Sequence, residues 1–235
     1  MNANEMAYSF DILYDKIVSG SSPGYTNREK SVFLTKAQDI LVDRYQGLEG
    51  DESRRVNLSN IKKTVEISTP SAVQGIGKPF GYRYDLPSDY LYPLSEEVTV
   101  VSSNDCLNGN RVRVVPKRED EYSIQIHNPL KKPAVIGSAG DLVWRIFNGD
   151  DGTTNRVDLI TDGTFTIGSY FLTYYKQSAD IIPVTAGDLS TTVQSDSELN
   201  PSCHEEIVEI AVRIASGVTT PQDYQITLNE EKINN

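Results

Sequence analysis

The residue types that most often carry out chemistry are few in this chain and form no recognisable pattern. The sequence holds two histidines and two cysteines. His204 follows Cys203 directly, but adjacent residues on a helix point in different directions, so this pair falls short of a zinc site. No HExxH or P-loop pattern occurs. The sequence therefore predicts no catalytic site, no cofactor and no bound metal, and hence a protein that is not an enzyme.

Tyrosines are the most promising side chains for binding. The chain has 13 of them, and several crowd around the segment DLPSDYLYPL. Exposed tyrosines mark protein interfaces and sugar-binding surfaces, because they bury a large area at a small entropic cost. We therefore select four candidate interface residues: Tyr82, Tyr84, Tyr90 and Tyr92. The alternative is that these rings simply cover a small sheet, since aromatic residues favour strands.

Acidic residues mark a second candidate surface. The formal net charge of −11 argues against DNA or an anionic membrane as a tightly bound partner. No basic residue lies between Lys176 and Arg213, whereas acidic residues recur there. Four of them form the candidate acidic surface: Asp180, Asp188, Asp196 and Glu198. Most charge blocks of this kind are solvated faces.

Three helices are predicted to position these residues. The patterns place them over residues 4–18, 26–45 and 200–216. Thr26 and Glu29 have the spacing of a capping box, and Asn200 is a good N-cap before Pro201. The third helix is the most apolar, with a stripe formed by Ile207, Ile210, Ala211 and Ile214. A stripe this broad needs covering from more than one side.

The middle of the chain reads as short strands and turns. Residues 97–101 and 111–115 have strand patterns, and residues 118–127 fit either a strand or a short helix. Three further strands at residues 143–148, 156–161 and 166–176 are separated by glycine-rich turns, which favours an antiparallel meander. We therefore expect an α+β fold, in which a helical bundle from both chain ends carries an inserted antiparallel β-rich lobe. Residues 1–76 and 198–216 would form the helical portion, and residues 77–197 the lobe.

The last stretch, residues 217–235, is predicted to be an extended C-terminal arm. Gly217 should end the preceding helix. Tyr224, Ile226 and Leu228 then occupy alternate positions, as on one face of a strand, and they join the tyrosines as candidate interface residues. Three apolar side chains cannot form a core alone, so we expect the arm to dock on another subunit. The alternative is a floppy tail.

Features of membrane and secreted proteins are missing from the sequence. There is no run of 18 apolar residues, so no transmembrane helix is expected. The segment MNANEMAYSF lacks the basic and apolar regions of a signal peptide. The two cysteines, Cys106 and Cys203, lie far apart and suggest a protein made in the cytosol without a disulfide framework.

The order of motifs resembles neck proteins of tailed bacteriophages. Two N-terminal helices precede LPSDYLYPL, then come REDEYSIQIHNPLKKP, a strand ending SYFLTYYK, and LNPSCHEEIVEIAVRIA at residues 199–215. The last motif is the most specific. In this order they resemble the head-to-tail adaptor and ring proteins below the portal, particularly those of crAss-like phages with short tails. The resemblance spans most of the chain and is weakest after Gly217.

This resemblance implies a structural virion protein of the neck or tail, made in the host bacterial cytoplasm. Such proteins form closed rings, commonly twelve-fold to match the portal. The implied partners are further copies of the chain, the portal, other neck or tail proteins, and genomic DNA that passes without specific binding. The acidic block would then face the lumen, where it would repel DNA and let it slide. The alternatives are a virion-surface adhesin or carbohydrate-binding module, and a hydrolase with an unrecognised site.

Overall fold

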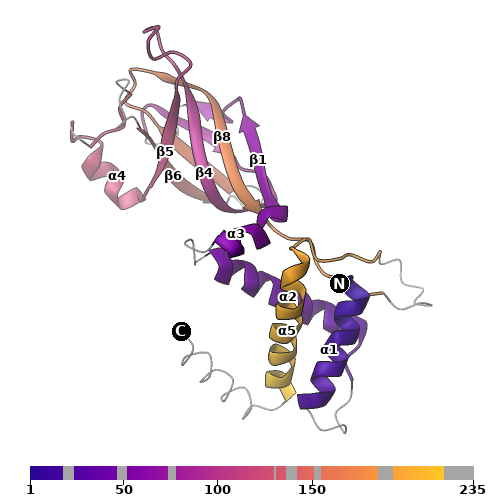
Figure 1. Ribbon diagram of the computed structural model, residues 1–235. Helices are drawn as coiled ribbons and strands as arrows, with labels where there is room; N and C mark the ends of the chain where they lie inside the picture. The colour runs from indigo at the N-terminus through magenta and orange to yellow at the C-terminus, as the bar shows by residue number, and fades with distance from the viewer. Residues whose placement is uncertain are drawn as a thin grey trace. The chain divides into compact units, whose positions relative to one another are not determined.

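The computed structural model describes residues 1–17, 24–46, 52–73, 78–129, 131–135, 142–150, 155–184 and 193–219. These residues form two compact units (Figure 1). The helical unit takes its residues from Met1–Ile61 and from Ser178 onward, and the sheet unit is Lys62–Gln177. Each helix of the described residues is too short or too polar to span a lipid bilayer.

Helices account for most of the first unit. Its elements are α1 (Ala3–Ile17), α2 (Asn27–Gln46), α3 (Glu52–Asn57), the 3₁₀ turns η1 (Ser59–Ile61) and η2 (Pro201–Cys203), and α5 (His204–Thr219). The capping box predicted for α2 is confirmed, since the Thr26 amide donates to Glu29 Oε2 at 2.8 Å. Asn200 caps η2 and accepts from the Ser202 amide at 3.1 Å, also as predicted.

Helix α5 is the centre of the helical unit. It packs against both α1 and α2, whereas α1 and α2 share few contacts with each other (Figure 1). The buried side chains include Met6 and Phe10 of α1, Leu34 and Leu41 of α2, and Ile207 and Ala211 of α5. The broad apolar stripe of α5 is thus covered from two sides by helices that lie far away in the sequence.

The second unit is one curled sheet of eight strands (Figure 1). The strands are β1 (Lys62–Ile67), β2 (Ala72–Val73), β3 (Gly81–Asp85), β4 (Tyr90–Val101), β5 (Arg111–Lys117), β6 (Leu142–Asp150), β7 (Asn155–Ile160) and β8 (Thr166–Lys176). Their order in the sheet is β1-β8-β4-β5-β6-β7-β3-β2. Helix α4 (Glu119–Gln125) lies in the connection between β5 and β6.

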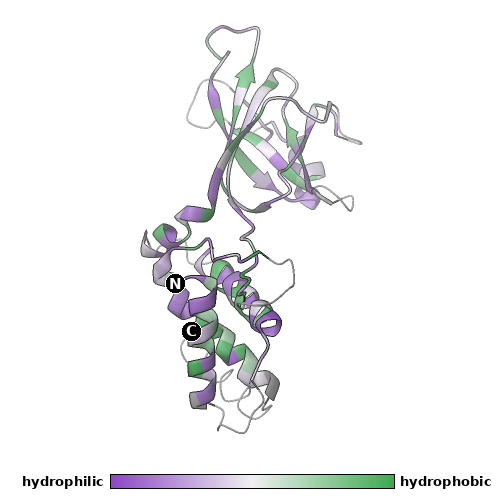
Figure 2. Ribbon diagram, turned by 90° about the vertical axis from the view of Figure 1, so that its right-hand side faces the viewer, coloured by the Kyte–Doolittle hydropathy of each residue, from purple (hydrophilic) through white to green (hydrophobic). Residues whose placement is uncertain are grey.

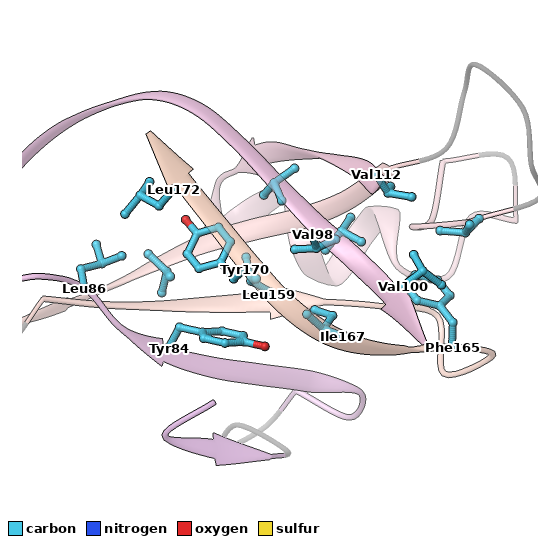
Figure 3. Packing of buried hydrophobic residues seen from close by; sticks show 14 of the residues in the cluster. Tyr84, Leu86, Val98, Val100, Val112, Leu159, Phe165, Ile167, Tyr170 and Leu172 are labelled. Carbon is cyan, nitrogen blue, oxygen red and sulfur yellow. The ribbon is translucent and has the colours of Figure 1, made fainter. Parts of the chain in front are cut away.

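The main core lies inside the curl. Hydrophobic and hydrophilic residues alternate along several strands (Figure 2), so one face of each strand can be buried. Four strands separate β3 from β8 in the sheet order, yet the Tyr84 and Tyr170 rings lie 5.4 Å apart (Figure 3). On the outer face, a smaller cluster of Trp144, Ile146 and Ile160 packs against residues of α4 and its C-terminal end.

The predicted fold class is wrong. The chain is a mixed α/β protein dominated by a curled sheet, with five α-helices in its described residues, rather than a helical bundle carrying an antiparallel lobe. Strands β5 and β6 are parallel neighbours, because the connection through α4 is long enough for a crossover. The predicted meander is confirmed for its first pair, since β6 and β7 are antiparallel neighbours, but it is wrong for the second, because β8 pairs with β1 and β4 and β7 pairs with β3.

Two boundaries affect how the predicted segments are distributed. Strand β1 pairs with β8 and belongs to the sheet unit, whereas the loop from Ser178 belongs to the helical unit. Helix α5 continues through Gly217 to Thr219, so the predicted helix end at Gly217 is wrong. The rest of the predicted arm, including Tyr224, Ile226 and Leu228, lies outside the described residues.

Candidate assembly interface

The four candidate tyrosines of β3 and β4 do not form one exposed patch. Tyr84 has no exposed surface and packs inside the sheet, which excludes it from an interface and corrects its assignment. Tyr82, Tyr90 and Tyr92 are half-buried. Strands β3 and β4 are not sheet neighbours, and the Tyr90 ring lies 5.7 Å from the Tyr174 ring. Three of these tyrosines therefore offer only partial surfaces to a partner.

The turn before β4 is fastened to two other strands through Asp89. Its carboxylate accepts from Lys63 Nζ of β1 at 2.5 Å and from the Tyr174 hydroxyl of β8 at 2.8 Å. Its backbone carbonyl accepts from the Gln177 amide at 2.7 Å. The hydrogen bond from Lys63 lowers the pKa of Asp89 below its ordinary value. The motif LPSDYLYPL thus ties β1, β4 and β8 together within one chain.

A buried polar cluster lies within the curl of the sheet. Glu96 of β4 accepts from the Tyr170 hydroxyl of β8 at 2.5 Å and from Arg145 Nη1 of β6 at 2.9 Å. Burial, followed by the nearby Glu96 carboxylate, raises the pKa of Tyr170. The hydroxyl of Tyr84 is buried and has no hydrogen-bond partner among the described residues, and burial raises the pKa of Tyr84 to about 12. Sequence patterning gave no sign that Glu96 faces inward.

A second buried charge cluster fastens α4 to the outer face of the sheet. Asp158 has 1% of its surface exposed and accepts from Arg83 Nε at 2.8 Å and Arg83 Nη2 at 3.1 Å. Lys78 Nζ lies 3.3 Å from Asp158 Oδ2 and 2.9 Å from Glu119 Oε2 at the start of α4. The charged groups are paired and mostly buried, as a stable cluster requires. This cluster therefore has a structural role in the monomer.

The predicted acidic residues have different surroundings. Asp196 is exposed, but its Oδ1 accepts from the Ala3 amide at 2.7 Å and so helps to cap α1. Half-buried Glu198 accepts from the Ala179 amide at 3.1 Å. Asp180 is exposed. The pKa of Asp39 is raised, first by the burial of Asp39 and second by the nearby negative charge of Asp180. Asp188 lies outside the described residues. Two of the four therefore also hold the helical unit together.

The net charge belongs almost entirely to one unit. Residues 62–177 contain 14 acidic and 13 basic residues, whereas the rest of the chain contains 19 acidic and nine basic ones. The helical unit is therefore the strongly acidic part of the protein. In the described residues, no group of three or more His, Cys, Asp or Glu side chains is placed to hold a metal ion.

His204 serves as a buried anchor in the helical unit. It is 4% exposed, and its Nε2 lies 3.3 Å from the Leu199 carbonyl oxygen. Its Nδ1 lies 3.0 Å from the Met1 ammonium nitrogen. Burial lowers the pKa of His204, which favours the neutral ring, with Nε2 as donor and Nδ1 as acceptor. The motif NPSCHEEIVEIAV is therefore explained by the start and packing of α5.

Several exposed apolar side chains escaped the sequence reasoning. Tyr8 and Ile12 of α1 are 69% and 40% exposed, and Ile124 of α4 is 76% exposed. Phe80 is 50% exposed and has a φ of 64°, which is uncommon for a residue other than glycine. The i, i+4 spacing of Tyr8 and Ile12, away from the buried Met6 and Phe10, was the available signal.

Comparisons with known proteins agree on one family. Residues 1–225 match the model of the family described as phage tail ring protein 3/4. The chain is 31% identical over 234 residues to "Ring protein 4/5" of Bacteroides phage crAss001, covering 92% of each chain. It is also 30% identical over 248 residues to "Ring protein 3" of the same phage, covering 98% of this chain and all of the relative. The resemblance to ring proteins of crAss-like phages is confirmed, and the chain belongs to the phage tail ring protein 3/4 family.

Proposed function

We propose that this chain is a non-enzymatic subunit of a closed, twelve-fold ring in the neck or tail of a phage, below the portal. The ring would extend the DNA conduit and bridge the portal to neighbouring neck or tail proteins. The family match over residues 1–225 carries this proposal. The related chains of crAss001 are named ring proteins and are matched over nearly their whole length, which supports the same architecture for this chain.

The charge distribution supports a passive role toward DNA. A conduit wall rich in carboxylates repels the phosphate backbone, and DNA can then slide without binding. We propose that the acidic helical unit supplies this wall and that Asp180 and Asp188 face the lumen. Asp196 and Glu198 belong to the same acidic stretch, but their contacts with Ala3 and Ala179 also stabilise the fold.

The ring itself is tested by measuring the mass of the purified chain under native conditions, alone and with the portal protein of the same phage. We expect a closed oligomer of one defined size, or one that assembles when the portal is added. Electron microscopy of the same sample would show the ring and its symmetry. The proposed function would be refuted if the chain stays monomeric at all concentrations and does not assemble when the portal protein is added.

The lumen is tested by reversing charges in the assembled ring. Asp180→Lys combined with Asp188→Lys should create DNA binding that weakens steeply as salt rises, because added lysines contact phosphates. The matched control reverses two exposed acidic residues of the sheet unit, Asp105→Lys and Asp120→Lys, with the same change in net charge. Equal DNA binding by both variants would show that DNA binding depends on net charge alone, and it would contradict the assignment of Asp180 and Asp188 to the lumen.

A further inference from the structure

Strand β1 is an unpaired edge of the sheet among the described residues. It pairs with β8 along one side only, from Lys62 opposite Tyr175 to Ile67 opposite Tyr170. Its other side therefore presents backbone N–H and C=O groups that need partners. Lys62, Lys63 and Glu66 place charges along this edge, which discourages unspecific pairing. A specific partner strand must therefore tolerate these charges.

The side chains of β1 show which face such a partner would have to cover. Val65 and Ile67 point to the inside of the curl and pack against the main core, but they remain only partly buried. Thr64 points to the opposite, outer face, where its hydroxyl lies 3.0 Å from the hydroxyl of Thr173. A strand beside β1 would complete the core only if its apolar residues faced Val65 and Ile67 and its polar residues continued the row of Thr64 and Glu66.

The end of this chain has the matching pattern. Residues 223–228 read DYQITL, in which Tyr224, Ile226 and Leu228 alternate with Asp223, Gln225 and Thr227. A strand places such residues on opposite faces. Next to β1, the three apolar side chains would shield Val65 and Ile67. The outer row would then receive Asp223, Gln225 and Thr227, of which only Asp223 adds a charge to the edge.

We propose that residues 223–228 of one copy add as a strand to the free edge of β1 in the next copy of the ring. This rests on the proposed ring, since a head-to-tail contact joins two different surfaces of identical subunits. The arm and the β1 edge are two such surfaces, and strand addition is a known mode of recognition. Only residues 220–222 separate Thr219 at the end of α5 from this strand. At about 3.3 Å per residue, the proposed strand must begin within about 13 Å of Thr219 in its own chain.

Disulfide cross-linking between chains that each carry one exposed cysteine tests the proposal. Exposed Cys106 is first replaced in Cys106→Ser, and Cys203 is buried. A Thr64→Cys chain is then mixed with a chain carrying Gln225→Cys or Thr227→Cys, assembled and mildly oxidised. Adjacent strands bring such outward residues within disulfide distance. We expect a reducible band with the mass of two chains for at least one of these mixtures.

A cysteine on the inward face of the proposed strand serves as the control for this experiment. Ile226→Cys points inward in the proposed strand, so it should not cross-link to Thr64→Cys. Cross-linking of Ile226→Cys as strong as at both outer positions, or no cross-linking in an assembled ring, would refute strand addition and leave the ring intact. A bond formed within a doubly substituted chain, without bonds between chains, would also refute it. If the wild-type chain forms no ring, both the proposed function and this inference are refuted.

Discussion

The buried cluster around Glu96 allows a quantitative test of the sheet unit. Glu96 is 8% exposed and accepts from Tyr170 and Arg145. Glu96→Gln keeps the size of the side chain but leaves Arg145, whose side chain is 12% exposed, without its carboxylate partner. Removing one partner of a buried ion pair typically costs about 3–5 kcal/mol. We expect a loss of about 3 kcal/mol in the free energy of unfolding, since glutamine still accepts a hydrogen bond.

Unfolding in urea, followed by tryptophan fluorescence, reports on this unit alone. Trp144 is the single tryptophan of the chain, is 1% exposed and lies in β6. With a urea dependence of about 1–3 kcal/mol per molar, a loss of about 3 kcal/mol lowers the midpoint by about 1–3 M. The slope of the transition should not change, because the same surface is exposed on unfolding.

The adjacent glutamate provides a matched control. Glu97 points to the outer face, and its side chain is 45% exposed at 3.5 Å from Arg111. Glu97→Gln should cost less than about 1 kcal/mol, as exposed ion pairs usually do. Replacing the whole buried pair, with Glu96→Leu and Arg145→Met together, should recover much of the stability lost in Glu96→Gln. Equal losses for the Glu96 and Glu97 variants would refute this account of the cluster.

Three further predictions concern single contacts. Tyr84→Phe removes a buried hydroxyl without a partner, so thermal unfolding should show unchanged or slightly higher stability, and a loss above about 1 kcal/mol would reveal a missing partner. Because the pKa of Asp89 is lowered in the folded state, the ionised carboxylate stabilises the fold above the ordinary value of 3.8, and this contribution is lost as pH falls through the lowered pKa. Lys63→Met should therefore be less stable than wild type at neutral pH, and the difference between the two free energies of unfolding should shrink as an acid titration proceeds. Gly163 has a φ of 86°, and a Cβ there would lie 2.7 Å from the Phe80 ring, so Gly163→Ala should cost at least about 1–2 kcal/mol in denaturant unfolding, whereas a neutral result would contradict the strain.

Local elements of this protein can be predicted from short stretches of its sequence. The helix starts at Thr26 and Asn200 depend on side chains that bond to backbone groups two or three residues away, so they can be read from short stretches. The strand predicted for residues 166–176 matches β8, because alternating and β-branched or aromatic residues favour extended chain. The motif at residues 199–215 pointed to the family that the comparisons confirm.

The tertiary structure alone decided which strands pair and which side chains become buried. Glycine-rich turns suggested that consecutive strands are neighbours, but β8 lies between β1 and β4, which come from much earlier in the chain. Tyr84 is buried because the curl brings β3 against β8. Glu96 and Glu97 are identical and adjacent in sequence, yet one lies inside the curl and the other outside. A two-residue period shows that they face opposite ways, but only the curl of the sheet determines which face excludes water.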